Sequence, residues 1–144
     1  MLVNVSHNDP EIKFKIKKLV GAAFPLIARL KMKRVGSPKL LITKSSAAIF
    51  SILNQDQSTD TCNIEFRPYG IIIGFQKRLE TYNLVIPYYK LTIYKGSSDE
   101  YTFYIDQHFI RVLVKSSQKT ALNFVNEVIA NKQLHAEIFS NDPY

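Results

Sequence analysis

Cysteine is almost absent from this chain, and its scarcity excludes several kinds of site. Cys62 is the only cysteine among 144 residues, so one chain can form neither a disulfide framework nor a CxxC metal site. Because Cys62 lies on the apolar side of an alternating run, we expect a buried thiol and not a nucleophile. The histidines are scattered, and none has the HxH or HExxH spacing of a metal site: His7, His108 and His135. We therefore expect no metal.

Glycine is scarce too, and no catalytic motif takes its place. Five glycines are too few for a phosphate cradle made from glycine runs, and no Walker loop, nucleophile elbow or dinucleotide fingerprint occurs. Acidic pairs such as Asp99-Glu100 lie in polar loops and are typical of solvated surface. We therefore expect a chain that is not an enzyme and that uses no cofactor.

Long hydrophobic runs are also missing. The uncharged run Leu19–Ala28 is far shorter than the roughly 20 residues of a membrane-spanning helix. Met1–Pro10 is polar and lacks the charged-then-apolar order of a signal peptide. We expect a soluble, cytoplasmic protein with a single domain over residues 1–144, a length that allows a sizeable core.

What the chain does have is positive charge, and that charge is uneven. The net charge is +7, but residues 1–44 hold ten Lys/Arg against two acidic residues, while residues 45–144 hold nine against ten. Such asymmetry suggests an anionic partner, although a solvated helix face is the plain alternative. Every tyrosine follows residue 68, away from the basic excess. Nucleic acid is therefore an unlikely partner, because single-strand binding interleaves aromatic and basic residues.

The basic segment, residues 9–35, has the pattern of a helix. Asp9-Pro10-Glu11 is a good helix start, and Gly36 with Pro38 ends it. Pro25 predicts a kink or a break into two helices. Strict alternation over residues 12–16 favours a strand instead, but the long helical stripe outweighs it. The apolar residues of this stripe, which we expect to face the core, are Ile12, Ile16, Leu19, Val20, Ala23, Ile27 and Leu30.

Residues 40–115 have the pattern of an antiparallel β-block, and residues 117–132 that of a closing helix. Short alternating runs separated by turns, with no helix between them, require an antiparallel sheet or barrel. The predicted strands are Leu40–Thr43, Ala48–Leu53, Thr61–Arg67, Ile71–Gln76, Tyr82–Ile86, Lys90–Tyr94, Tyr101–Ile105 and Phe109–Val114. Leu134–Tyr144 has no strong pattern.

The order of elements over residues 61–131 resembles a bacterial pleckstrin-homology-like (PH-like) domain of the GRAM-related kind. The similarity rests on the strand–turn–strand of Phe66–Ile73, on Val85-Ile86-Pro87-Tyr88, which is like the IPY step of that family, and on two further strands before a helix at Thr120–Ala130. The resemblance implies an α+β fold, in which a curved antiparallel sheet or small barrel is capped by a C-terminal helix. It also implies a binding or scaffolding module. The N-terminal helix is an addition to that pattern, and the basic residues do not lie in the first hairpin loop.

Two functional hypotheses compete for the N-terminal segment. In the first, its basic residues dock on an anionic surface such as membrane headgroups; these are Lys13, Lys15, Lys17, Lys18, Arg29, Lys31, Lys33 and Arg34. In the second, the opposite side of the helix meets a second copy or a protein partner, because it is apolar or small where a solvated face is polar. That side holds Phe14, Gly21, Ala22, Pro25, Ala28 and Met32. Self-association or a protein partner is our first expectation, peripheral membrane binding is the alternative, and a small enzyme with no recognisable motif is the third.

Overall fold

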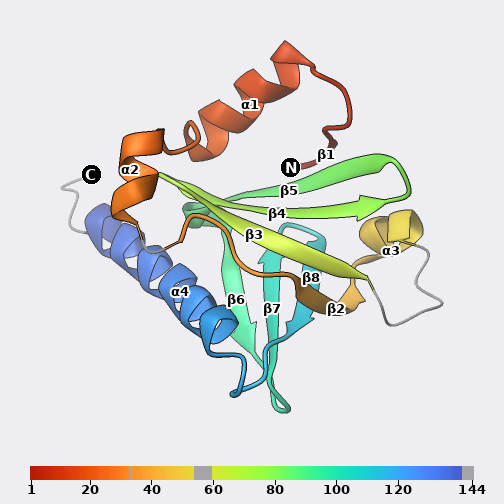
Figure 1. Ribbon diagram of the computed structural model, residues 1–144, viewed down its shortest axis with the longest axis vertical. Coiled ribbons are helices and arrows are strands. Elements are labelled where there is room, and N and C mark those ends of the chain that lie inside the picture. Colours follow the sequence, from red (N-terminus) through yellow and green to blue (C-terminus); the bar gives the residue numbers. More distant parts are fainter. Residues whose placement is uncertain (33, 54–59, 141–144) are drawn as a thin grey trace.

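One curved antiparallel sheet forms the body of the molecule. The computed structural model describes residues 1–32, 34–53 and 60–140. Within these ranges, eight strands pair in the order β1-β5-β4-β3-β2-β8-β7-β6 (Figure 1). The strands are β1 (Leu2–Asn4), β2 (Leu40–Ser45), β3 (Thr61–Arg67), β4 (Gly70–Lys77), β5 (Glu80–Pro87), β6 (Thr92–Lys95), β7 (Glu100–Ile105) and β8 (His108–Leu113). The helices are α1 (Pro10–Val20), α2 (Leu26–Lys31), α3 (Ala47–Leu53), the 3₁₀ helix η1 (Tyr88–Lys90) and α4 (Lys119–Ser140). The sheet is not closed, and the predicted α+β class is confirmed.

The main core lies between the inner face of the sheet and α4. Along β3, Cys62, Ile64 and Phe66 point inward and are buried, as their alternation predicts. The Phe66 ring stacks on Phe124 of α4 with a centroid distance of 4.3 Å, and Val125 is fully buried beside it. The closing helix is therefore confirmed, but it continues to Ser140 and so includes much of the segment for which the sequence predicted no pattern.

A smaller apolar cluster lies on the outer face of the sheet, under α1. Ile16 and Val20 of α1 pack against Ile72 of β4 and Val85 of β5. Figure 1 shows α1 resting on this face, opposite the side that α4 covers. The two cores together explain why β4 and β5 are apolar on both faces at this end of the sheet.

The predicted strand Ala48–Leu53 is wrong, because these residues form helix α3. Ile49 and Leu53, four residues apart, are both buried, while Phe50 is exposed. A short apolar run fits a strand and a buried helical turn equally well, so periodicity could not separate the two.

The N-terminal residues contain a strand that their polar composition did not predict. Strand β1 pairs with the edge of β5, with Val3 opposite Asn83. Three residues give no periodic signal of their own, so this strand depends on its partner. At the other edge, β6 begins at Thr92 and not at Lys90, because η1 follows Pro87.

The break predicted near Pro25 is confirmed, and it begins at Gly21. Helix α1 ends at Val20, and Gly21 adopts φ +89° while its N–H donates to the Lys17 carbonyl at 2.9 Å. A Cβ at Gly21 would lie 3.1 Å from Pro68. Only glycine meets this left-handed conformation and this close approach without strain.

Candidate functional site

Helix α2 is attached to the domain by the residues on either side of it. Phe24 precedes the helix and Met32 follows it, and both side chains pack against the main core. Between them, none of the residues of α2 itself is buried. Arg29 donates from Nε to the Phe24 carbonyl at 2.9 Å, which ties the helix back to its own entry. Helix α2 therefore projects from the surface between two side chains that contact the core, and we call its exposed side the ridge.

The outward side of α2 is aliphatic. Leu26, Ile27 and Leu30 are 73%, 72% and 78% exposed. The sequence predicted that Ile27 and Leu30 face the core, and this is wrong; Ala23 is exposed as well. The physical reason is the left-handed Gly21, which ends the helical register, so the stripe of α1 does not continue into α2.

The end of α1 is fixed by the turn between β3 and β4. Tyr69 donates its N–H to the Val20 carbonyl at 2.9 Å, and Arg67 donates from Nη1 to the Gly21 carbonyl at 3.0 Å. These bonds satisfy carbonyls that the helix end leaves unpaired. Because the turn belongs to two central strands, the ridge that follows Gly21 starts from a rigid point.

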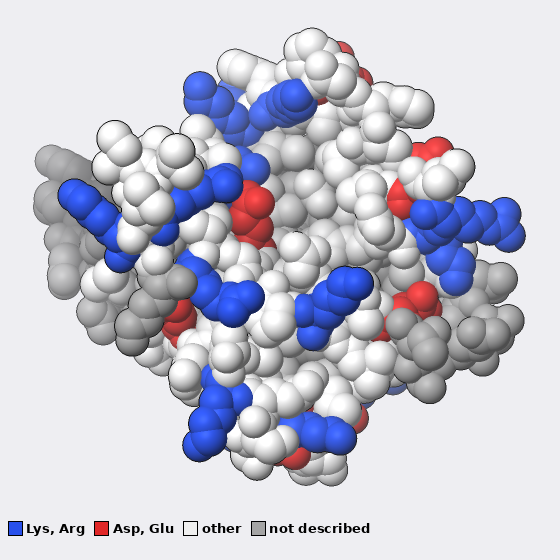
Figure 2. All heavy atoms as spheres, in the orientation of Figure 1, with Lys and Arg blue, Asp and Glu red and all other residues white. Residues whose placement is uncertain are grey.

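The predicted basic residues surround this region, and those that the structure describes are exposed. Lys15 forms an ion pair with Glu11 at 3.6 Å, one turn apart on α1, and Arg34 donates from Nε to the Gly36 carbonyl at 3.0 Å. Lys33 lies outside the described residues. Figure 2 shows Lys and Arg side chains spread over this face of the molecule. The exposed ones are Lys13, Lys15, Lys17, Lys18, Arg29, Lys31 and Arg34.

The residues predicted to form an interface are divided by the fold. Phe14, Ala22 and Pro25 are exposed, whereas Gly21 is buried against Pro68 of the same chain, and Ala28 and Met32 are half-buried. Gly21, one of the small residues that were expected to admit a second surface, is therefore already in contact within the molecule. The exposed members remain candidates.

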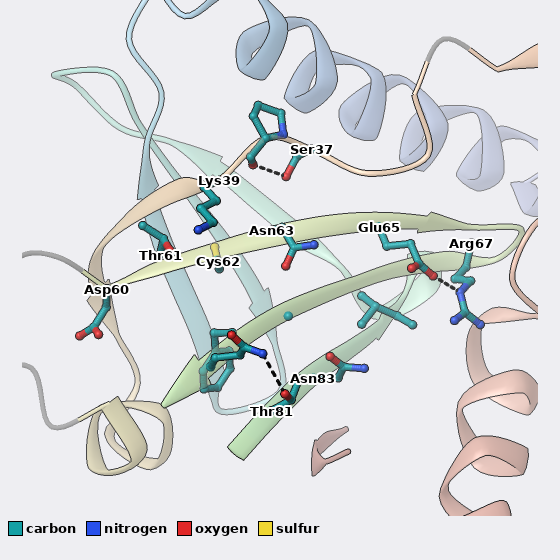
Figure 3. Close-up of a pocket in the computed structure, with 15 residues that line it drawn as sticks. Ser37, Lys39, Asp60, Thr61, Cys62, Asn63, Glu65, Arg67, Thr81 and Asn83 are labelled. Carbon is teal, nitrogen blue, oxygen red and sulfur yellow. Dashed lines mark hydrogen bonds and ion pairs between the residues drawn. The ribbon is translucent and has the colours of Figure 1, made fainter. Parts of the chain in front are cut away.

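A polar hollow of about 800 Å³ lies on the outer face of β3, β4 and β5, beside the part that α1 covers (Figure 3). The cross-strand register places floor residues in two rows, Asn63–Gly74–Asn83 and Gln76–Thr81, and Thr61 lines the same end of the hollow as the second row. Both rows consist of hydroxyls, amides and one glycine. The segment from Ser37 to Lys39, which is bonded to β3 through the Ser37 N–H and the Ile64 carbonyl, forms the wall of the hollow on the β3 side.

The centre of the hollow is the row Asn63–Gly74–Asn83. A Cβ at Gly74 would lie 3.2 Å from the Oδ1 atoms of both Asn63 and Asn83. Neither asparagine side chain makes a hydrogen bond to another residue in the described part of the chain. Gln76 donates from Nε2 to Thr81 Oγ1 at 3.2 Å in the adjoining row. The asparagine amides are thus free to bind a ligand.

The ionic groups of the hollow are largely paired at its ends. Arg67 pairs with Glu65 near α1, and Lys77 lies 4.0 Å from Asp60 at the other end. Cys62 contributes only its backbone side to the hollow, since its thiol faces the core and burial raises its pKa to about 12. This environment is that of a structural thiol, as the sequence predicted.

The described residues contain neither a cluster of metal-binding side chains nor a membrane-spanning helix. No three His, Cys, Asp or Glu side chains lie together there as a metal site. Among the helices of the same residues, none is long and apolar enough to cross a membrane. No family model, curated protein or solved structure matches this chain.

The sequence did not point to the hollow or to the ridge. Asparagine and glycine are depleted in strands, so Asn63, Gly74 and Asn83 were an available signal within predicted strands. Their meeting in one row depends on the register of three strands, which a single sequence does not give.

Proposed function

We propose that this chain is a non-catalytic binding module that docks on anionic membrane surfaces through α2. The observation that carries the proposal is the ridge of Leu26, Ile27 and Leu30, which are exposed on a helix flanked by the core contacts of Phe24 and Met32 and surrounded by basic residues. An interfacial element needs apolar side chains that enter the headgroup layer and cations that meet the phosphates. The ridge and its surroundings have both.

The energetic terms favour this surface over bulk water. Removing a Leu or Ile side chain fully from water contributes about 1.5–3 kcal/mol, and each Lys or Arg near an anionic leaflet adds about 1 kcal/mol. Because α2 is already ordered, binding does not first have to fold it. Three aliphatic side chains and several cations are together enough for reversible, salt-sensitive binding.

The charges also favour a membrane over an apolar protein partner. The centre of a protein interface is usually depleted of charge, whereas Arg29 and Lys31 lie within the same short helix as the exposed aliphatic residues. We propose a cytoplasmic location as well, where the membrane leaflet is anionic.

We further propose the PH-like relationship as the setting of this activity. It is supported by the open curved sheet with a C-terminal helix and by the Pro87-Tyr88 step. Tyr88 is buried there, and its carbonyl accepts from Lys132 of α4 at 3.3 Å.

Vesicle sedimentation tests the proposal. The protein should sediment with vesicles that contain phosphatidylserine and not with pure phosphatidylcholine. The triple substitution of Leu26, Ile27 and Leu30 to Ser should reduce the bound fraction at least about tenfold, since each aliphatic side chain contributes more than 1 kcal/mol. Raising the salt concentration should weaken binding of the unchanged protein.

Leu79→Ser is the matched control, because Leu79 is 97% exposed at the turn between β4 and β5, away from α2 (Figure 1). This variant should bind as the unchanged protein does. Equal binding by the triple variant, or no dependence on phosphatidylserine, would reject the membrane proposal.

Self-association through the same segment stays a prediction, since the exposed aliphatic ridge also suits a second copy. Light scattering at high concentration distinguishes the two. A dimer that the triple substitution converts to a monomer, together with no vesicle binding, would replace the membrane proposal by a homodimer.

A further inference from the structure

The polar hollow on β3, β4 and β5 has a composition that an ordinary solvated sheet face does not require. Central strands favour β-branched and aromatic residues, and asparagine and glycine are depleted there. Yet Asn63, Gly74 and Asn83 occupy one row across three adjacent strands. A glycine inside a strand often marks close approach of a ligand or of another backbone. The atoms nearest to a Cβ at Gly74 would be the two asparagine Oδ1 atoms and, at 4.0 Å, the Tyr82 carbonyl oxygen, and Gly74 lines the open hollow, so a ligand can approach it.

The space above Gly74 is what the glycine preserves. Any side chain there would start from a Cβ that is 3.2 Å from both asparagine Oδ1 atoms, a tight fit that would push the amides apart. Because Gly74 has no side chain, the two amides flank a depression over β4 from the strands on either side of it. Figure 3 shows Asn63 on β3 and Asn83 on β5.

The chemistry of the lining selects a class of ligand. At the centre the side chains are neutral amides and hydroxyls, and the Glu65–Arg67 and Asp60–Lys77 pairs neutralise the ends. Unpaired cations favour a phosphate or carboxylate ligand through charge-assisted hydrogen bonds, and Lys39 is the only cation without an ion pair among the described residues that line the hollow. An apolar ligand needs an apolar wall, which these residues do not form.

A hydroxyl-rich ligand fits both conditions. Each primary amide carries two donors and a carbonyl acceptor, and each hydroxyl of a sugar both donates and accepts. The volume of about 800 Å³ is within the usual range of roughly 300–1,000 Å³ for small-molecule sites.

We propose that this hollow binds a neutral, hydroxyl-rich ligand of one or two sugar rings, with Asn63 and Asn83 as its hydrogen-bonding residues over Gly74. The ligand is either a free sugar or the sugar headgroup of a lipid. Thr61, Gln76 and Thr81 extend the site along the strands. The proposal does not depend on membrane docking by α2.

Nuclear magnetic resonance titration of the full chain tests the site. The probes are glucose, galactose, N-acetylglucosamine, maltose and lactose, each taken to about 20 mM, which detects dissociation constants in the millimolar range. Glucose 6-phosphate and glucuronate serve as charged comparisons. At least one neutral sugar should shift the side-chain amide resonances of Asn63 and Asn83. Binding of only the charged probes, or shifts confined to other parts of the chain, overturns the proposal.

Substitutions locate the binding. Asn63→Ala and Asn83→Ala should each weaken binding about two- to tenfold, the effect of one neutral hydrogen bond. Gly74→Val should abolish it, because a branched side chain fills the space between the amides. Asn126→Ala, at an exposed position of α4, is the control and should change nothing. Unchanged affinity in both asparagine variants overturns the proposal even if Gly74→Val fails to fold.

The source of the sugar is distinguished with vesicles. Neutral phosphatidylcholine vesicles, with and without monogalactosyldiacylglycerol, offer a sugar headgroup without the anionic charge that α2 requires. Sedimentation only with the glycolipid, weakened in Asn83→Ala, assigns a lipid headgroup, whereas resonance shifts with free sugars alone assign a soluble sugar. If neither free sugars nor glycolipid vesicles bind, the site proposal fails, while binding to phosphatidylserine vesicles remains a separate result.

Discussion

Burial determines the ionisation of two side chains in the main core, Cys62 and Tyr88. Burial raises the pKa of the Cys62 thiol from 9.0 to about 12 and is the main cause that raises the pKa of the Tyr88 phenol from 10.0 to about 12. Both groups are thus held neutral in the folded protein under conditions in which the unfolded chain ionises. The difference links folding to alkaline pH.

Stability should therefore fall at high pH. Between about pH 9 and pH 12 the folded state holds protons that the unfolded state releases, so the free energy of unfolding decreases as pH rises. Each group contributes a slope of up to about 1.4 kcal/mol per pH unit. Urea denaturation at pH 8, 9.5 and 10.5 measures this. Cys62→Ala should flatten the curve between pH 9 and 10, and an unchanged slope in that variant would contradict the assignment.

Among the elements, α1 depends on a small contact area. Ile16 and Val20 are its only buried residues, and they meet Ile72 and Val85 on the outer face of the sheet. Ile12 and Leu19 pack beside them only partly buried, and hydrogen bonds at Gly21 and Tyr69 hold the end of the helix. Its local stability is expected to be lower than that of the sheet.

Val20→Ala should loosen α1 while the sheet stays folded. We expect a loss of about 1–3 kcal/mol in the free energy of unfolding, the range for truncating a buried aliphatic side chain. Hydrogen exchange should accelerate more for the α1 amides than for β3 and β7. Lys18→Ala, which alters an exposed neighbour, should leave both measurements unchanged. Equal acceleration throughout the chain would show that α1 is not a separate unit.

The elements also show where sequence patterns suffice and where they fail. Strand β3 was predicted correctly because Cys62, Ile64 and Phe66 alternate over a long enough run. Helix α3 was predicted as a strand, because its short run of apolar residues fits the spacing of a strand as well as that of a helix. The outward orientation of α2 was missed because it depends on the positive φ of Gly21 and on the close packing of Gly21 against Pro68, which lies in a distant turn.

At the scale of the whole molecule, the main core and the excess of positive charge lie in different parts of the chain. The sheet with α4 contains the main core, and the excess of positive charge lies in residues 1–44, which include β1, α1, α2 and all of β2 except Ser45. Two candidate sites result, the ridge on α2 and the hollow on β3, β4 and β5. The sequence predicted the charge of the first but not its apolar face. It predicted nothing of the second, which requires the strand register.

Insertion of α2 into a membrane can be observed directly, because the chain contains no tryptophan. Ile27→Trp places a single fluorophore on the ridge, and Leu79→Trp places one at the turn between β4 and β5. On vesicles that contain phosphatidylserine and brominated lipid, the fluorescence of Ile27→Trp should shift to shorter wavelength and be quenched, while that of Leu79→Trp should stay as in buffer. Identical behaviour of the two, or no change at residue 27 under conditions of low salt, would contradict membrane docking through α2.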